Sequence, residues 1–565
     1  MTQQKKIILF LTFVFFLSFV HSSLAQQLAQ ATIDEATRET DHSRRNEVEK
    51  KIQTPPKETP PKIEKEQQPT GPIKFSVKEI KLTGVESFSM EDFRPILQKY
   101  ENKEMTFDDL NLLTKDVETE YLKRGIIAAV FIPPQVMSQG VVTLQVVEAK
   151  MGQLHIPKHK YFKESRLKYY WTIKKGEVIH YKDILKSLQL MNKNPDRKVT
   201  STLHAGEEAQ TTDVTLKVDT TFPLHVVSSF DKEGVTSTGI NRYGDGGRYN
   251  NLLGFDDTFL AGTLFGNAFD SWYAYHSIPI SNSGTTLFYG HSFSESSPKK
   301  EFSSIGLNSQ ARTSSVFLKQ DLFKEGKIIG EVDLGFEAKE KTTKRDTGTI
   351  NRDRLRIARL NTLIIKEGAT SVTYFQPQVS QGLYAFGARK VDELSSRLAK
   401  PIFTKFNFDV QHKRALPWNL QAVFQLKTQI ASSRLTPQEQ FDLGGLNSIR
   451  GYPSSDFLAD DGVKTNFEIL TPAVFIPKNL RIPFTQKKVR DYVTLVTFLD
   501  YGWGNKRNIV NAEKDTANFL SAGGGIRIRL LPKMLLRMEW GFPIGDKTIT
   551  ETGKSRFHIS VDFES

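Results

Sequence analysis

The chain of 565 residues contains no cysteine. That absence excludes disulfide bonds, thiolate metal ligands and cysteine nucleophiles. The sequence also lacks the short motifs of zinc proteases, serine hydrolases and P-loop nucleotide-binding proteins, and its 11 histidines are scattered without metal-ligand spacing. We therefore expect no enzyme activity, no catalytic residue, no cofactor and no metal site. The aspartate pairs at 256–257 and 460–461 remain candidates for a divalent ion, but solvated loop carboxylates are the plainer interpretation.

Long apolar runs are also missing after residue 25, since none approaches the ~20 residues of a membrane-spanning helix. Any membrane span in the mature chain must therefore be built from strands. The net charge of +13, from 77 Lys and Arg against 64 Asp and Glu, is modest for this length. Because no basic run dominates, we expect no nucleic-acid partner. A composition that is 11% aromatic but only 38% hydrophobic suits strands with one apolar face.

The first 25 residues have the pattern of a secretory signal peptide. Lys5 and Lys6 precede the apolar run Ile7–Val20, and Ser23 and Ala25 occupy the small-residue positions of a cleavage site. We expect cleavage after Ala25 and export of the mature chain. An uncleaved anchor helix is the alternative, but the apolar run is short for it.

Residues 26–72 divide into two parts. Ile33–Ile52 is charged and lacks proline and glycine, which predicts a polar helix, and Thr54–Pro72 is a proline-rich extended linker. A polar helix on such a tether can plug a wet cavity. A plain disordered spacer is the alternative.

Two small α+β units are predicted between residues 73 and 221. The first unit, 73–148, has the order β-α-α-β-β and includes a helix over Thr106–Arg124 that ends at Gly125. The same order recurs in residues 149–221. Recurrence of one such unit indicates tandem domains.

From residue 222 to 565 the helical period disappears, and apolar residues alternate with polar ones. In Arg556–Phe563, for example, every second residue is apolar, and Arg, His, Ser and Asp occupy the other face. The second face is charged too often for a packed core, so a closed barrel with lipid outside and a wet lumen explains both faces. At roughly 20 residues per strand and connection, about 16 antiparallel strands fit. A large soluble β domain is the alternative.

Three motifs stand out along the chain: "YLKRGIIAAVFIPPQVMSQGVVTLQVVEAKMGQL" (Tyr121–Leu154), "LGGLNSIRGY" (Leu443–Tyr452) and "FLDYGWG" (Phe498–Gly504). They resemble those of one protein family, the two-partner secretion transporters, also called TpsB or ShlB/FhaC/HecB-type haemolysin activation/secretion proteins, in the BamA superfamily. Their order and separation after two repeats make the resemblance specific, and it covers the chain from about residue 33 to the end. The departures are Ala149, where the family usually has glycine, and a chain that ends Phe563-Glu564-Ser565 rather than on the aromatic residue.

The resemblance implies two polypeptide-transport-associated (POTRA) domains in the periplasm and a barrel in the bacterial outer membrane, in contact with its lipid. It implies export of an unfolded adhesin- or haemolysin-like partner protein without ATP, and dependence on the barrel assembly machinery during biogenesis. An outer-membrane insertase of the same superfamily is the alternative, although insertases usually have more POTRA domains. A gated uptake receptor would need a globular plug, and a passive porin would leave the POTRA domains without a role.

The resemblance also implies two sites. One is the edge of the first POTRA sheet, where strand addition would bind the client beside the helix Thr106–Arg124; its expected residues are Val141, Leu144, Val146 and Glu148.

The second site is a long loop, predicted over 432–463, whose tip the family folds into the lumen. Strand parity places Phe498, Asp500 and Gly502 on the lumen side. Arg450 would meet Asp500 in a bidentate contact that lysine cannot reproduce, with Gly451 and Tyr452 beside it.

Overall fold

The computed structural model describes residues 62–63, 74–135, 140–208, 211–235, 237–299, 306–482, 488–509, 514–531, 534–549 and 555–565. The expected signal peptide and the predicted helix Ile33–Ile52 lie outside these ranges. Within them, no helix combines the length and the apolar character needed to cross a membrane. The chain divides into two compact units, one built around residues 55–223 and the other around the strands that follow.

The first α+β repeat packs two helices against a three-stranded sheet. Helix α4 is amphipathic and begins after Thr106, whose hydroxyl accepts a hydrogen bond from the Asp109 backbone N–H. In the sheet β6 lies in the centre, parallel to β3 and antiparallel to β5. The elements are β2 (Phe75–Val77), β3 (Glu79–Thr83), α3 (Arg94–Leu97), β4 (Lys103–Met105), α4 (Phe107–Lys123), β5 (Ala128–Phe131) and β6 (Val141–Glu148).

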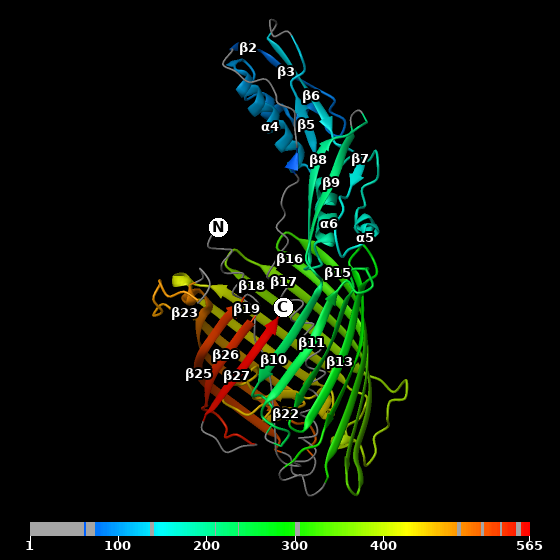
Figure 1. Cartoon of the computed structure of the whole chain (residues 1–565), viewed down its shortest axis with the longest axis vertical. Helices are drawn as coiled ribbons and strands as arrows, with labels where there is room; N and C mark the ends of the chain where they lie inside the picture. The colour runs from blue at the N-terminus through cyan, green and yellow to red at the C-terminus, as the bar shows by residue number, and fades with distance from the viewer. Residues whose placement is uncertain are drawn as a thin grey trace. The chain divides into compact units, whose positions relative to one another are not determined.

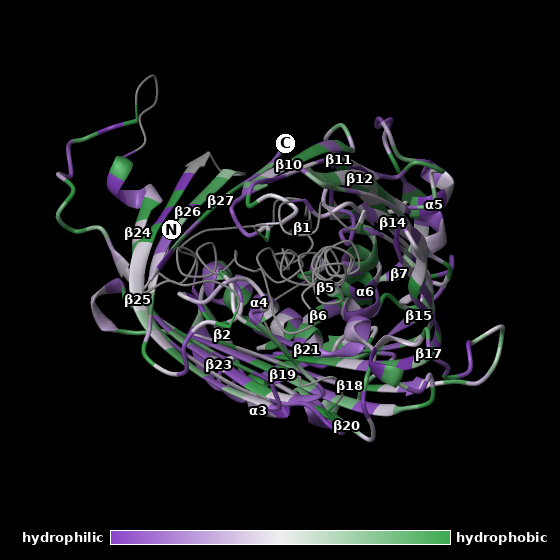
Figure 2. Ribbon diagram, turned by 90° about the horizontal axis from the view of Figure 1, so that it is seen from below, coloured by the Kyte–Doolittle hydropathy of each residue, from purple (hydrophilic) through white to green (hydrophobic). Residues whose placement is uncertain are grey.

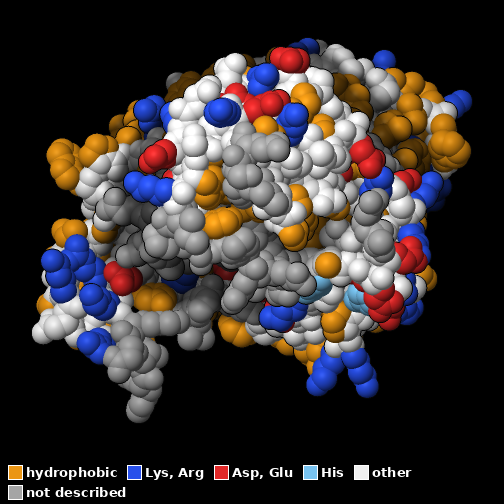
Figure 3. Space-filling view, turned by 90° about the horizontal axis from the view of Figure 1, so that it is seen from above, with side chains coloured by type: hydrophobic (Ala, Val, Ile, Leu, Met, Phe, Trp, Pro, Cys, Tyr) orange, Lys and Arg blue, Asp and Glu red, His pale blue; other side chains and the backbone are white. Residues whose placement is uncertain are grey.

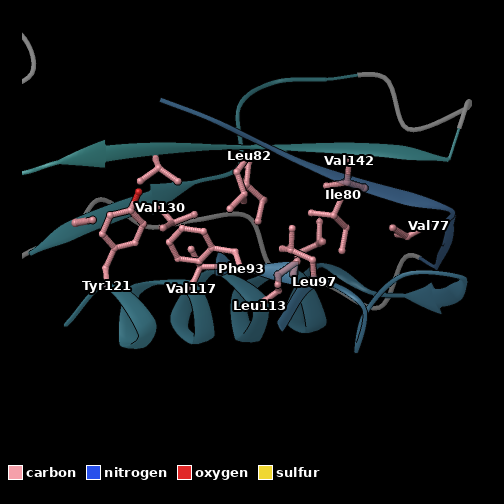
Figure 4. Close-up of a cluster of buried hydrophobic side chains, with 14 of the residues drawn as sticks. Val77, Ile80, Leu82, Phe93, Leu97, Leu113, Val117, Tyr121, Val130 and Val142 are labelled. Carbon is pink, nitrogen blue, oxygen red and sulfur yellow. The ribbon is translucent and has the colours of Figure 1, made fainter. Parts of the chain in front are cut away.

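The core of this repeat lies between α4 and the sheet (Figure 4). Leu113, Val117 and Tyr121 point from the helix toward the strands, where they meet side chains such as Val130 and Val142. All five side chains are buried. Because these helical positions recur every four residues, one face of α4 supplies its half of the core.

The second repeat has the same topology. Its first strand, β7, is parallel to its third, β9, and β8 is antiparallel to β9 on the other side. A short strand of the linker, β1 (Lys62–Ile63), pairs with β8 in parallel and so extends this sheet to the order β1-β8-β9-β7. The elements of the repeat are β7 (Lys150–His155), α5 (Glu164–Tyr170), α6 (Tyr181–Met191), β8 (Arg197–Ala205) and β9 (Thr211–Thr220).

One expectation about the first sheet is wrong. Val141, Leu144, Val146 and Glu148 were expected at an open edge, but they lie on β6, which has a neighbour on each side. The parallel β3–β6 pairing, which joins the first strand to the third, moves β6 into the centre. The edge strand beside α4 is β5.

The described residues from Leu224 onward form a closed antiparallel barrel of sixteen strands, as expected (Figure 1). It closes where β10 pairs with β27, from Val227–Glu564 to Asp231–Ser560. The final residue continues this seam, since the Ser565 backbone N–H donates to the Val226 carbonyl at 2.9 Å. The strands are β10 (Leu224–Asp231), β11 (Arg242–Asn250), β12 (Thr258–Gly266), β13 (Phe269–Pro279), β14 (Thr285–Ser296), β15 (Asn308–Glu325), β16 (Ile328–Arg345), β17 (Gly348–Glu367), β18 (Ser371–Gly382), β19 (Thr404–Ala415), β20 (Gln421–Ala431), β23 (Asp461–Pro472), β24 (Val493–Asn505), β25 (Thr516–Leu531), β26 (Met534–Pro543) and β27 (Arg556–Glu564).

The two faces of the barrel wall differ in chemistry. Hydrophilic and hydrophobic residues alternate along its strands (Figure 2), and large apolar side chains such as Leu334, Leu360 and Trp540 are exposed. Figure 3 shows hydrophobic side chains at the margin of the face seen from above. An apolar outside and a polar inside are what a barrel in lipid requires.

The long loop between β20 and β23 spans residues 432–460 and lies within the ring of strands (Figure 2). It ends three residues earlier than predicted, because Asp461 already pairs with Asn505 of β24. Inside the loop, β21 (Phe441–Leu443) and β22 (Phe457–Ala459) form a two-stranded hairpin. The hairpin side chains pack with Ala517 and Phe519 of the wall in a small apolar core. The loop is thus a folded part of the barrel interior.

Candidate functional site

The lumen face of β24 is the one that strand parity predicts. Phe498, Asp500 and Gly502 are on the buried side of the strand, whereas Leu499 and Tyr501 are exposed on the other. Asp500 itself has no exposed surface. A carboxylate in this position needs a partner, because burial of an unpaired charge is unfavourable.

Arg450 of the loop is that partner. Its Nε and Nη2 donate to the two oxygens of Asp500 at 2.7 and 2.6 Å, which is the expected bidentate contact. The Arg450 backbone N–H donates to the same carboxylate at 3.0 Å. The guanidinium lies 3.6 Å from the centroid of the Phe498 ring, a cation–π distance. The predicted meeting of Arg450, Asp500 and Phe498 is therefore present.

Four further charged residues, which the sequence did not assign to this contact, extend it into a network of ion pairs. The remaining Arg450 nitrogen, Nη1, donates to Glu468 on β23 at 2.6 Å and to Glu539 on β26 at 2.8 Å. Arg527 on β25 bridges the same two glutamates at 2.7–2.9 Å. Arg537 donates to Glu539 at 3.1 Å. We refer to this set as the arginine cluster: Arg450, Asp500, Glu468, Glu539, Arg527 and Arg537.

Three guanidinium groups and three carboxylates balance the formal charge of the arginine cluster. Removing one partner of a buried pair typically costs ~3–5 kcal/mol, because the other charge stays buried and uncompensated. Within this cluster, Arg450 joins the loop to strands β23, β24 and β26. Since its polar contacts are non-covalent and water can replace them, such an attachment can be made and broken.

Gly451 allows the loop backbone to touch the wall. A Cβ built on Gly451 would lie 2.8 Å from the Gly541 carbonyl carbon, and one on Gly541 would lie 2.4 Å from the Gly451 nitrogen. Gly451 also has a φ of +89°, which disfavours a side chain. Any larger residue at either position would push the loop and the wall apart.

The seam strand also binds the loop tip. The Gly451 N–H donates to Nε2 of His558 on β27 at 3.0 Å, and Nδ1 of His558 lies 2.7 Å from Glu233. The Glu233 carboxylate, after β10, also accepts from the Leu446 N–H and the Ser454 hydroxyl. Sequence reasoning missed Glu233 and His558, because they lie near opposite ends of the barrel segment.

Tyr452 is fully buried and stacks on Phe519 of β25, with ring centroids 4.1 Å apart and planes 15° apart. Its hydroxyl donates to the carbonyls of Leu520 and Asp546 at 3.2 and 2.9 Å. Gly502 leaves room for the loop, because a Cβ there would lie 2.9 Å from Ile449. Tyr452 therefore holds the tip by stacking and hydrogen bonds, and Gly502 contributes by leaving space for it.

At the first POTRA sheet, Glu148 is a buried structural residue. It accepts hydrogen bonds from the backbone N–H groups of Glu86 and Ser87, from the Ser87 hydroxyl and from the Tyr121 hydroxyl. Burial opposes ionisation, but these donors outweigh it and hold the Glu148 pKa below its ordinary value. Leu144 and Val146 are buried with it, and Val141 is half-buried.

The edge strand β5 has one of its backbone donors occupied by a side chain. Glu118 of α4 accepts from the Val130 N–H at 2.8 Å. Since α4 lies beside β5, this N–H points away from β6. The corresponding strand of the second repeat, β8, carries β1 on that edge. Both repeats therefore have an outer strand at the same topological position. In the first, a side chain occupies one backbone N–H of that strand, and in the second a short strand pairs with it.

Comparison with known families gives two matches. The sequence model described as "Haemolysin secretion/activation protein ShlB/FhaC/HecB" matches residues 210–530. The model described as "POTRA domain, ShlB-type" matches residues 75–149. The first match covers more than half of the chain.

Curated relatives and solved structures agree with these matches. The heme/hemopexin transporter protein HuxB of Haemophilus influenzae is 21% identical over 495 residues, covering 83% of each chain. The outer membrane transporter CdiB of Dickeya dadantii is 22% identical over 391 residues, covering 67% of this chain and 69% of CdiB. The structure of CdiB from Escherichia coli aligns with a TM-score of 0.66 and 18% identity, covering 95% of this chain and 98% of CdiB. BamA from Haemophilus ducreyi lacking POTRA domains 1–3 aligns with a TM-score of 0.58 and 12% identity, covering 87% of this chain and 100% of the BamA chain.

Proposed function

Because the chain belongs to the ShlB/FhaC/HecB family of haemolysin secretion/activation proteins, we propose that it recognises an unfolded exported partner through its POTRA domains and secretes that partner through its barrel. The protein is an outer-membrane two-partner secretion transporter, with a transmembrane barrel and POTRA domains that are periplasmic in this family. Beyond this, we propose that the POTRA domains recognise the unfolded partner and that it passes through the barrel without ATP.

The observation that supports passage through the barrel is the attachment of the long loop inside it. The loop fills part of the lumen, and the charged contacts of the arginine cluster hold its tip to three strands. Moving these contacts would open the lumen without unfolding the wall. A passive porin would have no need for such a removable obstruction.

The observation that supports recognition by the POTRA domains is the strand edge in each sheet. The β1–β8 pairing is an example of strand addition to a POTRA sheet within this chain. Strand addition reads the backbone rather than the side chains, so it suits an unfolded client. We propose β5 of the first repeat as a client edge, in place of the central strand β6. CdiB and HuxB are named as transporters, and the partner proposed here is an exported polypeptide of the adhesin or haemolysin type.

Co-expression tests this function. The full chain is produced in an outer-membrane-bearing host together with a candidate client, a large exported protein of the adhesin or haemolysin type. The client is then measured in the medium and in the periplasm. We expect the client in the medium only when the transporter is present. Equal amounts in the medium with and without the transporter would overturn the proposal.

A further inference from the structure

A second buried charge cluster holds the same loop, eleven residues before Arg450. Glu439 ends the short helix η6 (Pro437–Glu439), and its side chain is buried. Its carboxylate accepts from three cations of the barrel wall at 2.8–2.9 Å. We refer to this set as the glutamate cluster: Glu439, Lys339 on β16, Arg359 on β17 and Lys405 on β19.

The glutamate cluster reverses the charge arrangement of the arginine cluster. Here the loop supplies the carboxylate and the wall supplies the cations, whereas at Arg450 the loop supplies the cation. The strands also differ, since Glu439 is attached to β16, β17 and β19 and Arg450 to β23, β24 and β26. The loop is therefore attached to two separate parts of the wall. At one of them the loop carries the negative charge, and at the other it carries the positive charge.

The backbone strengthens the attachment at Glu439. Lys405 Nζ donates to the Glu439 carbonyl oxygen at 3.0 Å in addition to its contact with the carboxylate. Gln429 of β20 donates to the same carbonyl at 3.1 Å. Side chain and main chain of one loop residue are thus both held, which fixes the position of the loop before the tip is reached.

A carboxylate of the wall stands beside the glutamate cluster. Glu337 on β16 accepts from Arg359 Nε at 2.8 Å and lies 3.7 Å from Lys339 Nζ. When Glu439 leaves, two of the three cations keep a carboxylate within reach. The cost of release is therefore lower than for an isolated buried pair, and the attachment is reversible.

We propose that Glu439 is a positioning residue that fixes the first limb of the loop to the wall independently of Arg450, and that both clusters must break before the loop can leave the lumen. The consequence for export rests on the function proposed above. The position of the loop does not, because it can be measured without a client.

A single-cysteine reporter measures that position. The chain has no cysteine, so Leu446→Cys, at a loop residue that is 2% exposed, gives one thiol that reacts with a maleimide only when the loop moves. In the full-length purified protein we expect Glu439→Gln to accelerate labelling at least about tenfold, as loss of a buried partner would. Glu340→Gln is the matched control, since it removes a β16 carboxylate paired only within the wall, with Arg354 and Arg356, and we expect no change from it.

Three further variants separate the contributions of the two clusters. Lys405→Gln should accelerate labelling in the same way. The double variant Lys405→Gln with Glu439→Gln should be labelled little faster than either single variant. Glu439→Gln with Arg450→Ala should exceed both single changes, because the two clusters act independently. Labelling at the original rate in both Glu439→Gln and Lys405→Gln barrels, each shown to be folded by heat-modifiable migration, would overturn the proposal. If the unsubstituted chain exports no client but the variants are still labelled faster, the proposed function is rejected and this inference stands.

Discussion

The loop in the barrel and the strand edges of the POTRA repeats bind their partners by different chemistry. Named side chains hold the loop, with Arg450 alone contacting three carboxylates. Each edge instead presents the backbone, to Glu118 in one repeat and to β1 in the other. The difference indicates that the loop requires particular residues, whereas the edges tolerate sequence variation in what they bind. Single substitutions should therefore act strongly in the barrel and weakly at the edges.

The largest effect is expected from removing the first POTRA repeat entirely. Deletion of Phe75–Glu148 takes away a whole edge, so we expect client secretion to be abolished. The barrel has its own strand pairing from Leu224 onward and should still assemble. Client in the medium and heat-modifiable migration of the transporter measure the two outcomes. Normal secretion by the deleted protein would show that this edge is not needed.

Within the barrel, Arg450→Ala and Asp500→Ala should each reduce secretion at least about tenfold while the barrel still assembles. Each change leaves a buried charge without its partner, a cost of ~3–5 kcal/mol. The double variant should be little worse than either, since the two residues form one contact. Arg450→Lys is the control for geometry and should also fail, because lysine cannot make the bidentate contact.

Tyr452→Ala should give a milder loss, because the tip keeps its ionic contacts when the ring stacked on Phe519 is removed. Additive effects of Arg450→Ala and Asp500→Ala, or full secretion by Asp500→Ala, would contradict the account of the loop.

Removal of Gln26–Pro72 tests the predicted plug helix Ile33–Ile52. If the helix occupies the wet lumen, ion conductance in planar bilayers should rise while secretion continues. Conductance equal to that of the full chain would favour a plain spacer.

The smallest effect is expected at the edge of β5. Glu118→Gln weakens the hydrogen bond that the Val130 N–H donates to this side chain, so a client strand displaces it more easily. Client affinity should therefore rise by roughly twofold to fivefold, which corresponds to about 0.5–1 kcal/mol for one backbone hydrogen bond. Binding of an unfolded client to the full-length protein measures it, with Glu120→Gln, whose carboxylate pairs with Lys123 and Arg124 on α4, as the matched control. Weaker binding in Glu118→Gln would indicate that Glu118 itself contacts the client.

Strand parity predicted more of the site than strand order did. The two-residue period placed Asp500 and Phe498 toward the lumen, and the same period put Glu539, Arg527 and Arg537 on the polar face of their strands. Their assembly around Arg450 depends on the register between strands, for example the direct pairing of Arg527 with Arg537. Alternation within one strand excludes a slip of one residue, but it does not distinguish registers that differ by two residues.

The same limit explains the error at β6. Its apolar alternation correctly indicates a strand, but parallel pairing with β3 decides that it lies in the centre. Such a contact joins residues more than sixty positions apart and leaves no local signal. Of the expected edge residues, Leu144, Val146 and Glu148 are therefore buried, and Glu148 accepts four hydrogen bonds, whereas Val141 is half-buried.

Translocation in a defined system measures passage through the barrel without ATP. The full-length protein is placed in liposomes with its POTRA domains outward, and an unfolded client is added outside in the absence of any nucleotide. We expect the client to become protected from added protease in the presence of the transporter, and Asp500→Ala to prevent this. Protection no greater than with empty liposomes, or protection that requires ATP, would contradict this expectation.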